Sequence, residues 1–342
     1  MFLEQIPRTD PGESIRCQDS SQSKAVDQNS DSKNIKADAA LAHEAYQAIW
    51  KDSILRALDY NNIEILAKNA YVSLYGHVTS LTNQHQAENA IQSVDGVLGI
   101  KDHLIPDDRL VAEVATALGS LEHTYDCKFF TGVSHGVVLL SGDVDNEEIK
   151  LLAEKYAASN PNVRGVVSSI RVRGSELDLH GEPFLQPSIG AVISFLDGIS
   201  GRVRQVIINP DNRRVVAMTI QGRFTNQRQD LNSFNNDETR LPERILVIPM
   251  TAVRYLTRAS GFLNIHIKDT NQYMKFDAAH FFAPNEDWKA PYPYCAGDVL
   301  FPFKLQDPEN KITPQLSQSP LSIRLEEKSL KEELLENDSL GG

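Results

Sequence analysis

An internal repeat constrains the fold of this chain more than any other feature of its sequence. The stretch His135–Val144, with the sequence HGVVLLSGDV, has an earlier counterpart in Asn69–Val78, with the sequence NAYVSLYGHV. The same shift relates further positions: Leu74, Gly76 and Val78 recur as Leu140, Gly142 and Val144, and Val97, Gly99 and Ile100 recur as Val163, Gly165 and Val166. Such self-similarity marks one structural unit that is used twice. The repeat therefore predicts two copies of one small module.

The spacing of apolar residues predicts the order helix, strand, strand, helix, strand in the first module. Apolar stripes with a spacing of three and four indicate the helices, and alternating apolar residues indicate the strands. The expected segments are 46–58, 63–66, 71–78, 87–94 and 97–105. Thr79 is a candidate N-cap for the second helix. In the strand 71–78, we expect Val72, Leu74 and Val78 to face the core and His77 to point outward.

The second module repeats this order. Its first helix is expected around 110–118, its hairpin at 127–131 and 137–144, and its last strand at 166–172. Asp145 and Glu148 have the spacing of a capping box, which predicts a second helix that runs through Tyr156. His77 of the first copy corresponds to Asp143 of the second, which favours an outward polar position over a metal ligand.

Changes in composition place the other boundaries. We expect a disordered arm at 1–40, the modules at 41–105 and 106–173, a polar linker at 174–185, a further domain at 186–267, an aromatic and proline-rich extension at 268–303, and a polar mobile tail at 304–342. The arm and the tail contain too few apolar residues to order themselves. Within the tail only Leu321–Leu335 has helical spacing, and we expect it to be mobile or bound to a partner.

Residues 186–267 follow a different pattern, in which short β-branched runs are separated by turns and no helical spacer intervenes. These runs are 191–195, 201–208, 214–220, 245–248 and 262–267. Several short strands of this kind predict a small all-β barrel. The predicted fold class is therefore α+β: two tandem small αββαβ modules followed by a small barrel, with disordered N- and C-terminal tails.

Composition excludes several classes of protein. The 342 residues are 41% hydrophobic, which is enough for two to three globular domains. A net charge of -12 argues against binding of the whole molecule to nucleic acid or anionic lipid. Neither a secretory signal nor an apolar run long enough for a membrane span is present, so we expect a cytoplasmic protein. Cys17, Cys127 and Cys295 show no metal-ligand spacing, and we expect three free thiols.

Catalytic and ligand-binding motifs are not found. His77, His85 and His103 lack partners at metal-ligand spacing, and no nucleophile elbow or phosphate-binding glycine loop occurs. We therefore expect no enzyme, cofactor, metal or small-molecule substrate. Turn and close-packing roles are expected instead for one set of residues: Gly76, Gly136, Gly142, Gly165, Gly190, Gly198, Gly201 and Pro249.

Charge is distributed unevenly along the chain. Residues 41–173 hold 17 acids and 11 bases, whereas residues 186–266 hold ten bases, all arginine, and six acids. Arginine suits bidentate contacts with carboxylate or phosphate and is common at interfaces. The candidate interaction surface consists of Arg202, Arg204, Arg213 and Arg214. The alternative is that these arginines cover a solvated sheet face.

The paired pattern resembles the BON domain, a small α/β module of bacterial osmotic-stress, secretin and channel proteins. The second copy fits best, through Gly136, Val138, Leu140, Gly142 and Val144. The first copy departs from the pattern because Ala70 stands where the family usually has a hairpin glycine. The resemblance implies binding of phospholipid surfaces or hydrophobic ligands, or a role in assembly.

Residues 186–267 resemble the PRC-barrel. The similarity rests on Gly190, the Asp197–Gly198 turn with Gly201, the run Val206–Pro210 and the Ile248–Pro249 pair. Members of this family include the cytoplasmic part of photosynthetic reaction-centre H subunits and one half of ribosome-maturation factors. PRC-barrels are mainly docking modules, so the resemblance implies a protein partner.

These observations favour a non-enzymatic adaptor or scaffold that docks to a protein partner or assembly. One alternative is a peripheral protein of the stress-response type that binds phospholipid membrane surfaces. Another is association with the ribosome or RNA through the arginine-rich barrel, against which the overall acidity argues. A hydrolase is the least supported alternative. Self-association is also expected to be open to this chain, since strand edges can pair between copies.

Overall fold

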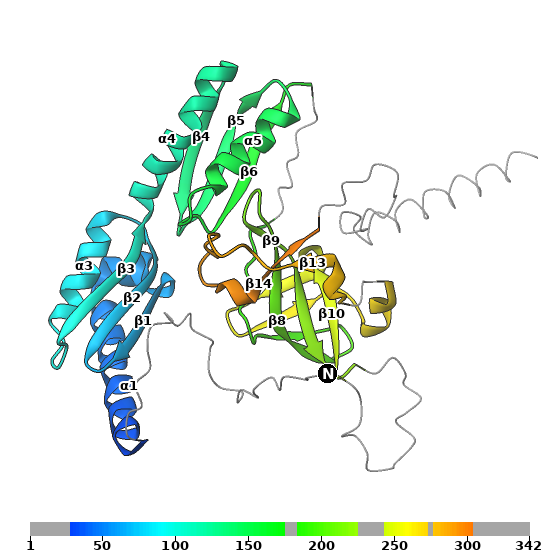
Figure 1. Ribbon diagram of the computed structural model, residues 1–342. Coiled ribbons are helices and arrows are strands. Elements are labelled where there is room, and N and C mark those ends of the chain that lie inside the picture. Colours follow the sequence, from blue (N-terminus) through cyan, green and yellow to red (C-terminus); the bar gives the residue numbers. More distant parts are fainter. Residues whose placement is uncertain (1–27, 175–182, 225–242, 273–275, 304–342) are drawn as a thin grey trace, which may run out of the picture. The chain divides into compact units, whose positions relative to one another are not determined.

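The fold was analysed in a computed structural model, which describes residues 28–174, 183–224, 243–272 and 276–303 (Figure 1). The chain forms two compact units. Unit 1 comprises Met1–Phe184, Asn209–Arg214 and Pro284–Ala296, and unit 2 comprises Leu185–Ile208, Val215–Ala283 and Gly297–Gly342. Unit 1 contains two three-stranded sheets, and the third sheet has eight strands and curls into a half-barrel. The predicted α+β class is confirmed.

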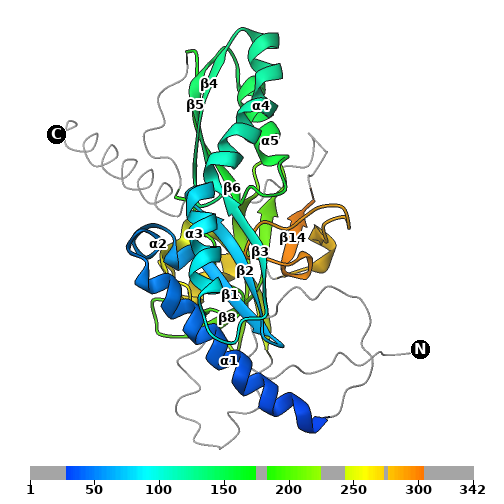
Figure 2. The ribbon, with the colours of Figure 1, turned by 90° about the vertical axis from the view of Figure 1, so that its left-hand side faces the viewer.

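The first module has the predicted order of elements, with a sheet ordered β1-β2-β3. Its elements are α1 (Gln28–Lys51), α2 (Ser53–Leu58), a 3₁₀ turn (Tyr60–Asn62), β1 (Ile63–Lys68), β2 (Tyr71–Val78), α3 (Leu81–Gln92) and β3 (Gly99–Pro106). Figure 2 shows α1 and α3 along one face of this sheet. α1 begins earlier than expected, because residues 28–40 were expected to belong to the disordered arm.

Local capping explains two differences from the predicted helices. The helix expected over 46–58 is broken, because the Asp52 carboxylate accepts hydrogen bonds from the backbone N–H groups of Ile54 and Leu55 and starts α2. Ser80, rather than Thr79, caps α3 through a bond from the Asn83 N–H. The hydroxyl and N–H of Thr79 instead donate hydrogen bonds to Asp59.

The second module contains α4 (Asp107–Tyr125), β4 (Lys128–Ser134), β5 (Val137–Val144), α5 (Glu147–Ala158) and β6 (Gly165–Val172). Its sheet is ordered β4-β5-β6. Asn146, not Asp145, is the N-cap of α5, because its side chain accepts from the Ile149 N–H. The predicted capping box is therefore wrong by one residue. Asn146 is equivalent to Ser80 of the first module, so the repeat extends to the caps.

Strand register repeats with a constant shift of 66 positions, from 78 to 144. Tyr71 pairs with Gly99 in the parallel ladder β2–β3, and Val137 pairs with Gly165 in β5–β6. The two hairpin turns also match. Asn69 and Ala70 have φ of 53° and 64°, and His135 and Gly136 have φ of 46° and 78°. Ala70 thus adopts the left-handed conformation that the family usually gives to glycine, and the turn keeps its geometry.

Each module buries one face of its sheet against its helices. Val72, Leu74 and Val78 are fully buried in the first core, as predicted, and their equivalents Val138, Leu140 and Val144 are buried in the second. Gly76 and Gly142 occupy equivalent positions with φ of 121° and 152°. A Cβ at either glycine would approach a carbonyl oxygen of the neighbouring chain segment, at 1.9 Å from Asn62 and 2.5 Å from Lys128. Only glycine fits there.

Unit 2 is built around the eight-stranded sheet, whose main path is β10-β9-β8-β7-β12-β11. The strands are β7 (Val192–Ser194), β8 (Ser200–Asn209), β9 (Arg214–Gly222), β10 (Arg244–Pro249), β11 (Val253–Leu256), β12 (Ser260–Leu263), β13 (Phe281–Phe282) and β14 (Val299–Pro302). Short 3₁₀ turns lie at Met250–Ala252, Ile267–Gln272, Ala278–His280 and Ala296–Asp298. β11 was not predicted, and the strand expected over 262–267 ends at Leu263.

The sheet extends past the expected boundary at residue 267. β14 pairs in parallel with β8, through Val299 opposite Val206, and also pairs with β13. Part of the aromatic and proline-rich segment therefore completes the half-barrel instead of only wrapping around it. The apolar face of β14 was hard to recognise, because prolines and aromatic residues surround a strand of four residues.

Candidate interaction surfaces

Asp59 and His135 connect the two modules of unit 1. Asp59, which follows α2, is fully buried and accepts bonds from the N–H and hydroxyl of Thr79, at 2.8 and 2.7 Å, and from the Asn83 amide at 2.6 Å. His135, in the β4–β5 turn, places Nε2 at 3.5 Å from Asp59 Oδ1 and at 3.1 Å from the Leu58 carbonyl oxygen. The turn of the second module is thereby held against the helix end of the first.

The electrostatics of this pair favour its charged form. Burial acts to raise the pKa of Asp59, but hydrogen bonds with His135, Thr79 and Asn83 outweigh it and hold the pKa below its usual value. The hydrogen bond with Asp59 raises the pKa of His135, although burial opposes it. The two groups therefore stabilise each other as carboxylate and imidazolium.

Asp107 fixes the same turn from within the second module. It is buried in the first turn of α4 and accepts the backbone N–H groups of His135, at 2.5 Å, and Gly136, at 2.9 Å. Burial raises the pKa of Asp107 despite these two bonds. Arg164 adds a bond from Nη1 to the His135 carbonyl oxygen at 3.0 Å. The backbone of the turn is therefore held by contacts that do not involve the pair of His135 and Asp59.

His77 does not point into solvent, contrary to the prediction. It is 1% exposed, and its Nε2 lies 2.9 Å from the carbonyl oxygen of Asn162 in the second module. A Cβ at Gly136 would lie 2.4 Å from the ring, so the glycine makes room for it. Burial lowers the pKa of His77 to about 4. The face was correctly predicted to lie opposite the module core, but the neighbouring turn and Tyr292 cover it.

Tyr292 comes from the Pro284–Ala296 segment of unit 1. Its ring meets His77 edge-on at a centroid distance of 5.9 Å, and its hydroxyl donates to Glu64 at 3.3 Å. The guanidinium of Arg164 lies 5.8 Å from the same ring. Tyr292 therefore contacts both modules, which gives the aromatic segment a packing role that its composition alone did not indicate.

Arg213 is a buried clamp, not part of an open basic surface. It is 3% exposed and donates from Nε to the Val163 carbonyl at 2.7 Å, and from Nη2 to those of Pro161, at 3.3 Å, and Lys289, at 2.7 Å. Its guanidinium lies 4.8 Å from the ring centroid of Trp288. Burial lowers its pKa to about 10. These groups all belong to unit 1.

The other candidate arginines are dispersed. Arg202 and Arg204 are exposed on β8 and donate to the Gly190 carbonyl and the Gln221 side chain. Arg214 is half-buried and donates to the Pro183 carbonyl. The structure therefore does not bring the four arginines together, because Arg213 serves internal packing and its neighbour in sequence bonds to the chain backbone.

The remaining glycine and proline candidates lie at close packing contacts, in turns or at a strand end. Gly165 lies beside Phe184 and Arg213, and Gly201 lies against Ile220 and Phe224, where a Cβ would be 2.4 and 2.5 Å from the nearest atoms. Gly190 and Gly198 have φ of 81° and 82° in open turns. Pro249 is buried at the end of β10.

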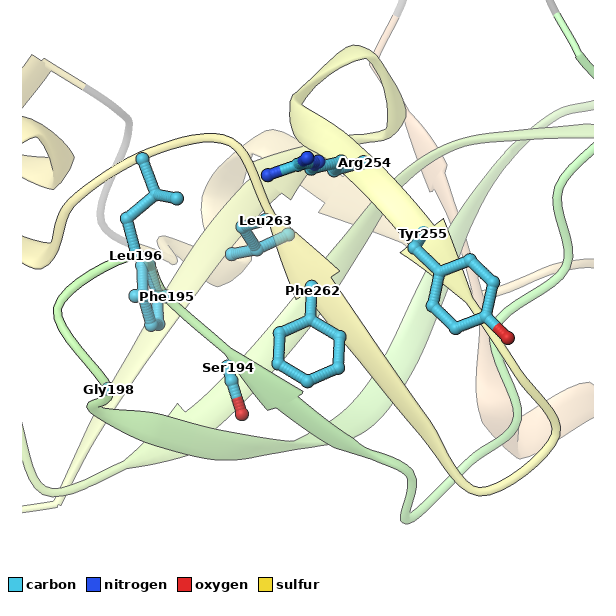
Figure 3. Close-up of a pocket in the computed structure, with 8 residues that line it drawn as sticks. All are labelled: Ser194, Phe195, Leu196, Gly198, Arg254, Tyr255, Phe262 and Leu263. Atoms are coloured by element: carbon cyan, nitrogen blue, oxygen red, sulfur yellow. The ribbon is translucent and has the colours of Figure 1, made fainter.

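A hollow of about 460 Å³ opens on unit 2 between β7, β11 and β12 (Figure 3). Its lining consists of Ser194, Phe195, Leu196, Gly198, Arg254, Tyr255, Phe262 and Leu263. Leu196, Tyr255 and Phe262 are 46%, 58% and 51% exposed, whereas Phe195 and Leu263 are buried beneath them. Arg254 is the one charged side chain of the lining. The hollow is thus apolar with a cation at its rim.

This hollow was not predicted from the sequence, although adjacent large apolar residues in one strand gave a signal for it. Adjacent residues of a strand point to opposite faces, so two large apolar neighbours cannot both enter one core. Phe262–Leu263 of β12 is such a pair: Phe262 is 51% exposed, Leu263 is 1% exposed, and both line the hollow. Phe129–Phe130 and Leu139–Leu140 of the second module follow the same rule and leave Phe130 and Leu139 68% and 48% exposed.

In the described part of the chain, no group of three or more His, Cys, Asp or Glu side chains could hold a metal ion. None of the described helices combines the length and apolarity that crossing a membrane requires. Cys127 is a free thiol, but Cys295 is disulfide-bonded, which corrects the expectation of three free thiols. Sequence spacing gave no sign of it, because a disulfide requires proximity only in space.

Family comparison agrees with the repeat. A BON domain is found in two segments of the chain, residues 37–105 and 131–174. These segments lie within the first and the second module of the repeat. No family model identifies residues 186–267 as a PRC-barrel. Comparison with curated proteins gives no match.

Two solved structures show partial similarity. One is CdsD, a structural protein of the type III secretion system of Chlamydia trachomatis, with 15% identity and a TM-score of 0.33 over 39% of this chain and 61% of that one. The other is the C-terminal domain of CdsD, with 15% identity and a TM-score of 0.32 over 39% of this chain and 64% of that one. The chain therefore spans less than two thirds of each, and similarity at this level carries no argument about function.

Proposed function

We propose that this protein is a non-enzymatic adaptor, in which the tandem BON unit is joined to a half-barrel that docks a protein partner. The observation that carries the proposal is the hollow of unit 2, where Leu196, Tyr255 and Phe262 expose apolar surface and Arg254 is the one charged side chain of the lining. The PRC-barrel resemblance of the same region supports a docking role.

The chemistry of the hollow fits a protein better than the alternatives. Aromatic residues and arginine are the residues that most often dominate protein interfaces, because they combine a large contact area with directed polar contacts. Burial of apolar surface contributes roughly 25 cal/mol per Å². A partner that covers Tyr255 and Phe262 and places a carboxylate near Arg254 would satisfy both parts of the site.

The two other functions receive less support from the described residues. An RNA surface would need several free cations and stacking platforms, whereas Arg213 is buried and Arg202 and Arg204 bond to their own unit. An anionic membrane would need a broader basic patch than Arg254 provides. Flotation of the full-length protein with anionic vesicles tests the lipid alternative.

The test is a quantitative affinity capture with the full-length tagged protein. Proteins recovered with the wild type are compared with those recovered by Phe262→Ser and Tyr255→Ser. Leu98→Ser is the matched control, since Leu98 is 74% exposed and lies in unit 1. We expect a stoichiometric partner with the wild type and the control, and at least a tenfold lower recovery with the hollow variants. Equal recovery with all four proteins would reject the hollow as the docking site.

A further inference from the structure

We propose that the C-terminal segment 321–338 of this chain docks into the hollow of unit 2 and competes there with the partner. The proposal rests on the function proposed above, in that it treats the hollow as a docking site, and it adds an intramolecular occupant. The occupant is identified from charge, apolar content and reach.

The hollow sets the chemistry that an occupant must have. Its floor and walls are apolar, formed by Phe195, Leu263, Tyr255 and Phe262, so the occupant must provide large apolar side chains. Its one charged lining residue is Arg254, so the occupant must provide a carboxylate. Arg258, which follows β11 in the sequence, is also exposed. An acidic segment with several apolar residues meets both requirements.

Segment 321–338 has this composition. Its apolar residues are Leu321, Ile323, Leu325, Leu330, Leu334 and Leu335. Its acids are Glu326, Glu327, Glu332, Glu333, Glu336 and Asp338, against the bases Arg324, Lys328 and Lys331. Six acids and three bases give the segment a net charge of -3, opposite to that of the hollow. The leucines lie next to the acids, as Glu332-Glu333-Leu334-Leu335-Glu336 illustrates.

The chain connection makes this contact attainable within one molecule. Phe303 is the last described residue before the tail, and it belongs to unit 2, as the hollow does. It follows β14, which pairs with β8, and β8 pairs with β7 at the wall of the hollow. The residues from 304 to 320 can span up to about 55 Å when extended, more than the roughly 30 Å diameter of a small domain.

Tethering strengthens such a contact. A covalent tether can hold a segment near its site at an effective concentration that reaches the millimolar range. A weak contact between a leucine, an adjacent glutamate and the hollow can therefore be well populated within the molecule. A partner must then displace the segment, which would make access to the hollow adjustable.

The test uses the full-length protein and a fluorescein-labelled synthetic peptide of residues 319–338. In the variant Leu330→Ser/Leu334→Ser/Leu335→Ser the tethered segment no longer fills the hollow, so we expect the peptide to bind at least tenfold more tightly than to the wild type. Adding Phe262→Ser or Arg254→Glu to this variant should weaken peptide binding at least tenfold. Arg202→Glu, another exposed arginine of unit 2, is the charge control and should leave it unchanged.

The outcomes separate the proposal from its rivals. Equal peptide affinity for the wild type and the triple-leucine variant, or unchanged binding after Phe262→Ser, would overturn the proposal. A doubled mass in sedimentation that the triple-leucine variant abolishes would show docking between two copies and overturn the intramolecular arrangement. Unchanged thermal unfolding of Phe262→Ser confirms that its fold is intact. If capture recovers no partner while the peptide binds as expected, the adaptor function fails and the tail contact stands.

Discussion

The imidazole of His135 lies 3.5 Å from the fully buried carboxylate of Asp59, measured from Nε2 to Oδ1. His135 belongs to the hairpin turn of the second module, and Asp59 follows α2 of the first. Asp107 holds the backbone of this turn, so the contact joins the turn of the second module to the first module. The junction between the modules is therefore a defined charged pair.

Asp59→Ala should destabilise the protein strongly. The substitution leaves the Thr79 N–H and the Asn83 amide without their acceptor, and removes the counter-charge of His135. We expect a loss of about 3 kcal/mol in the free energy of unfolding, as for other broken buried charge networks. Asp143→Ala is the control, since Asp143 forms an exposed ion pair with Arg171 that contributes about 1 kcal/mol or less. Urea denaturation measures both, and equal losses would contradict the account.

Stability should depend on the protonation of His135. A group whose pKa is raised by folding stabilises the folded state below its unfolded pKa, and this contribution is lost as the pH rises through the folded pKa. Because the pKa of His135 is raised above its usual value of 6.5, its contribution should be present below pH 6.5 and lost as the pH rises through the folded pKa. The difference in unfolding free energy between wild type and His135→Gln should be larger at pH 6 than at pH 8. A difference that grows toward pH 8 would have the wrong sign.

His77 should show the opposite behaviour. Its pKa is lowered from 6.5 to about 4 by burial, so stability falls as the pH drops from 6.5 toward 4, because only the unfolded chain binds the proton. This pKa shift corresponds to a loss of about 3 kcal/mol in the free energy of unfolding by about pH 4. NMR titration of the ring can follow it: His77 should stay neutral down to about pH 4, while His135 stays protonated above 6.5. Titration of both rings at 6.5 would disprove their burial at the junction.

Substitution by alanine should affect stability in opposite directions at a glycine of the repeat and at a glycine in a helix. Gly142→Ala places a Cβ at 2.5 Å from the Lys128 carbonyl oxygen with φ at 152°, and should cost about 2 kcal/mol of stability. Gly119→Ala in α4 meets no atom within 4 Å and should stabilise by about 0.5–1 kcal/mol, because alanine favours the helix. Thermal unfolding of both variants tests the comparison, which fails if their melting temperatures move in the same direction.

The Arg213 clamp predicts that lysine cannot replace arginine. Lysine keeps the charge but lacks the planar fork that reaches the carbonyls of Val163 and Lys289 and stacks on Trp288. Arg213→Lys should lower the unfolding free energy by about 2 kcal/mol, because buried carbonyl groups lose their donors. Arg204→Lys, on an exposed strand position, should change it little. Chemical denaturation distinguishes the two, and a neutral Arg213→Lys would show that the clamp does not stabilise unit 1.

Sequence patterns predicted the parts of the fold that depend on local periodicity. The repeat of Leu74 and Leu140 correctly predicted two equal modules, since the same alternation buries both residues in the same register. The predictions that failed concerned residues whose burial depends on contacts with distant parts of the chain. His77 was assigned to an outward face, and that face is covered by Asn162 and Tyr292, which come from remote parts of the sequence.

The candidate site was less predictable than the fold. Arg213 looked like a member of a basic surface, and only its contacts with three distant carbonyls show it to be a clamp. The hollow depends on β11, a strand of four residues with no clear alternation, so its position next to β12 could not be inferred. Phe262 and Leu263 carried a usable signal, because one of two adjacent apolar strand residues must leave the core.

The central claim is that the hollow of unit 2 contacts a protein. The most direct measurement is photo-crosslinking in the native cell from a photoreactive residue at position 262, with position 130 as the matched exposed aromatic site in unit 1. The account predicts a discrete adduct with another protein from position 262, lost when Arg254 is changed to Glu, and none of the same mass from position 130. Adducts with lipid alone, or identical adducts from both positions, would contradict it.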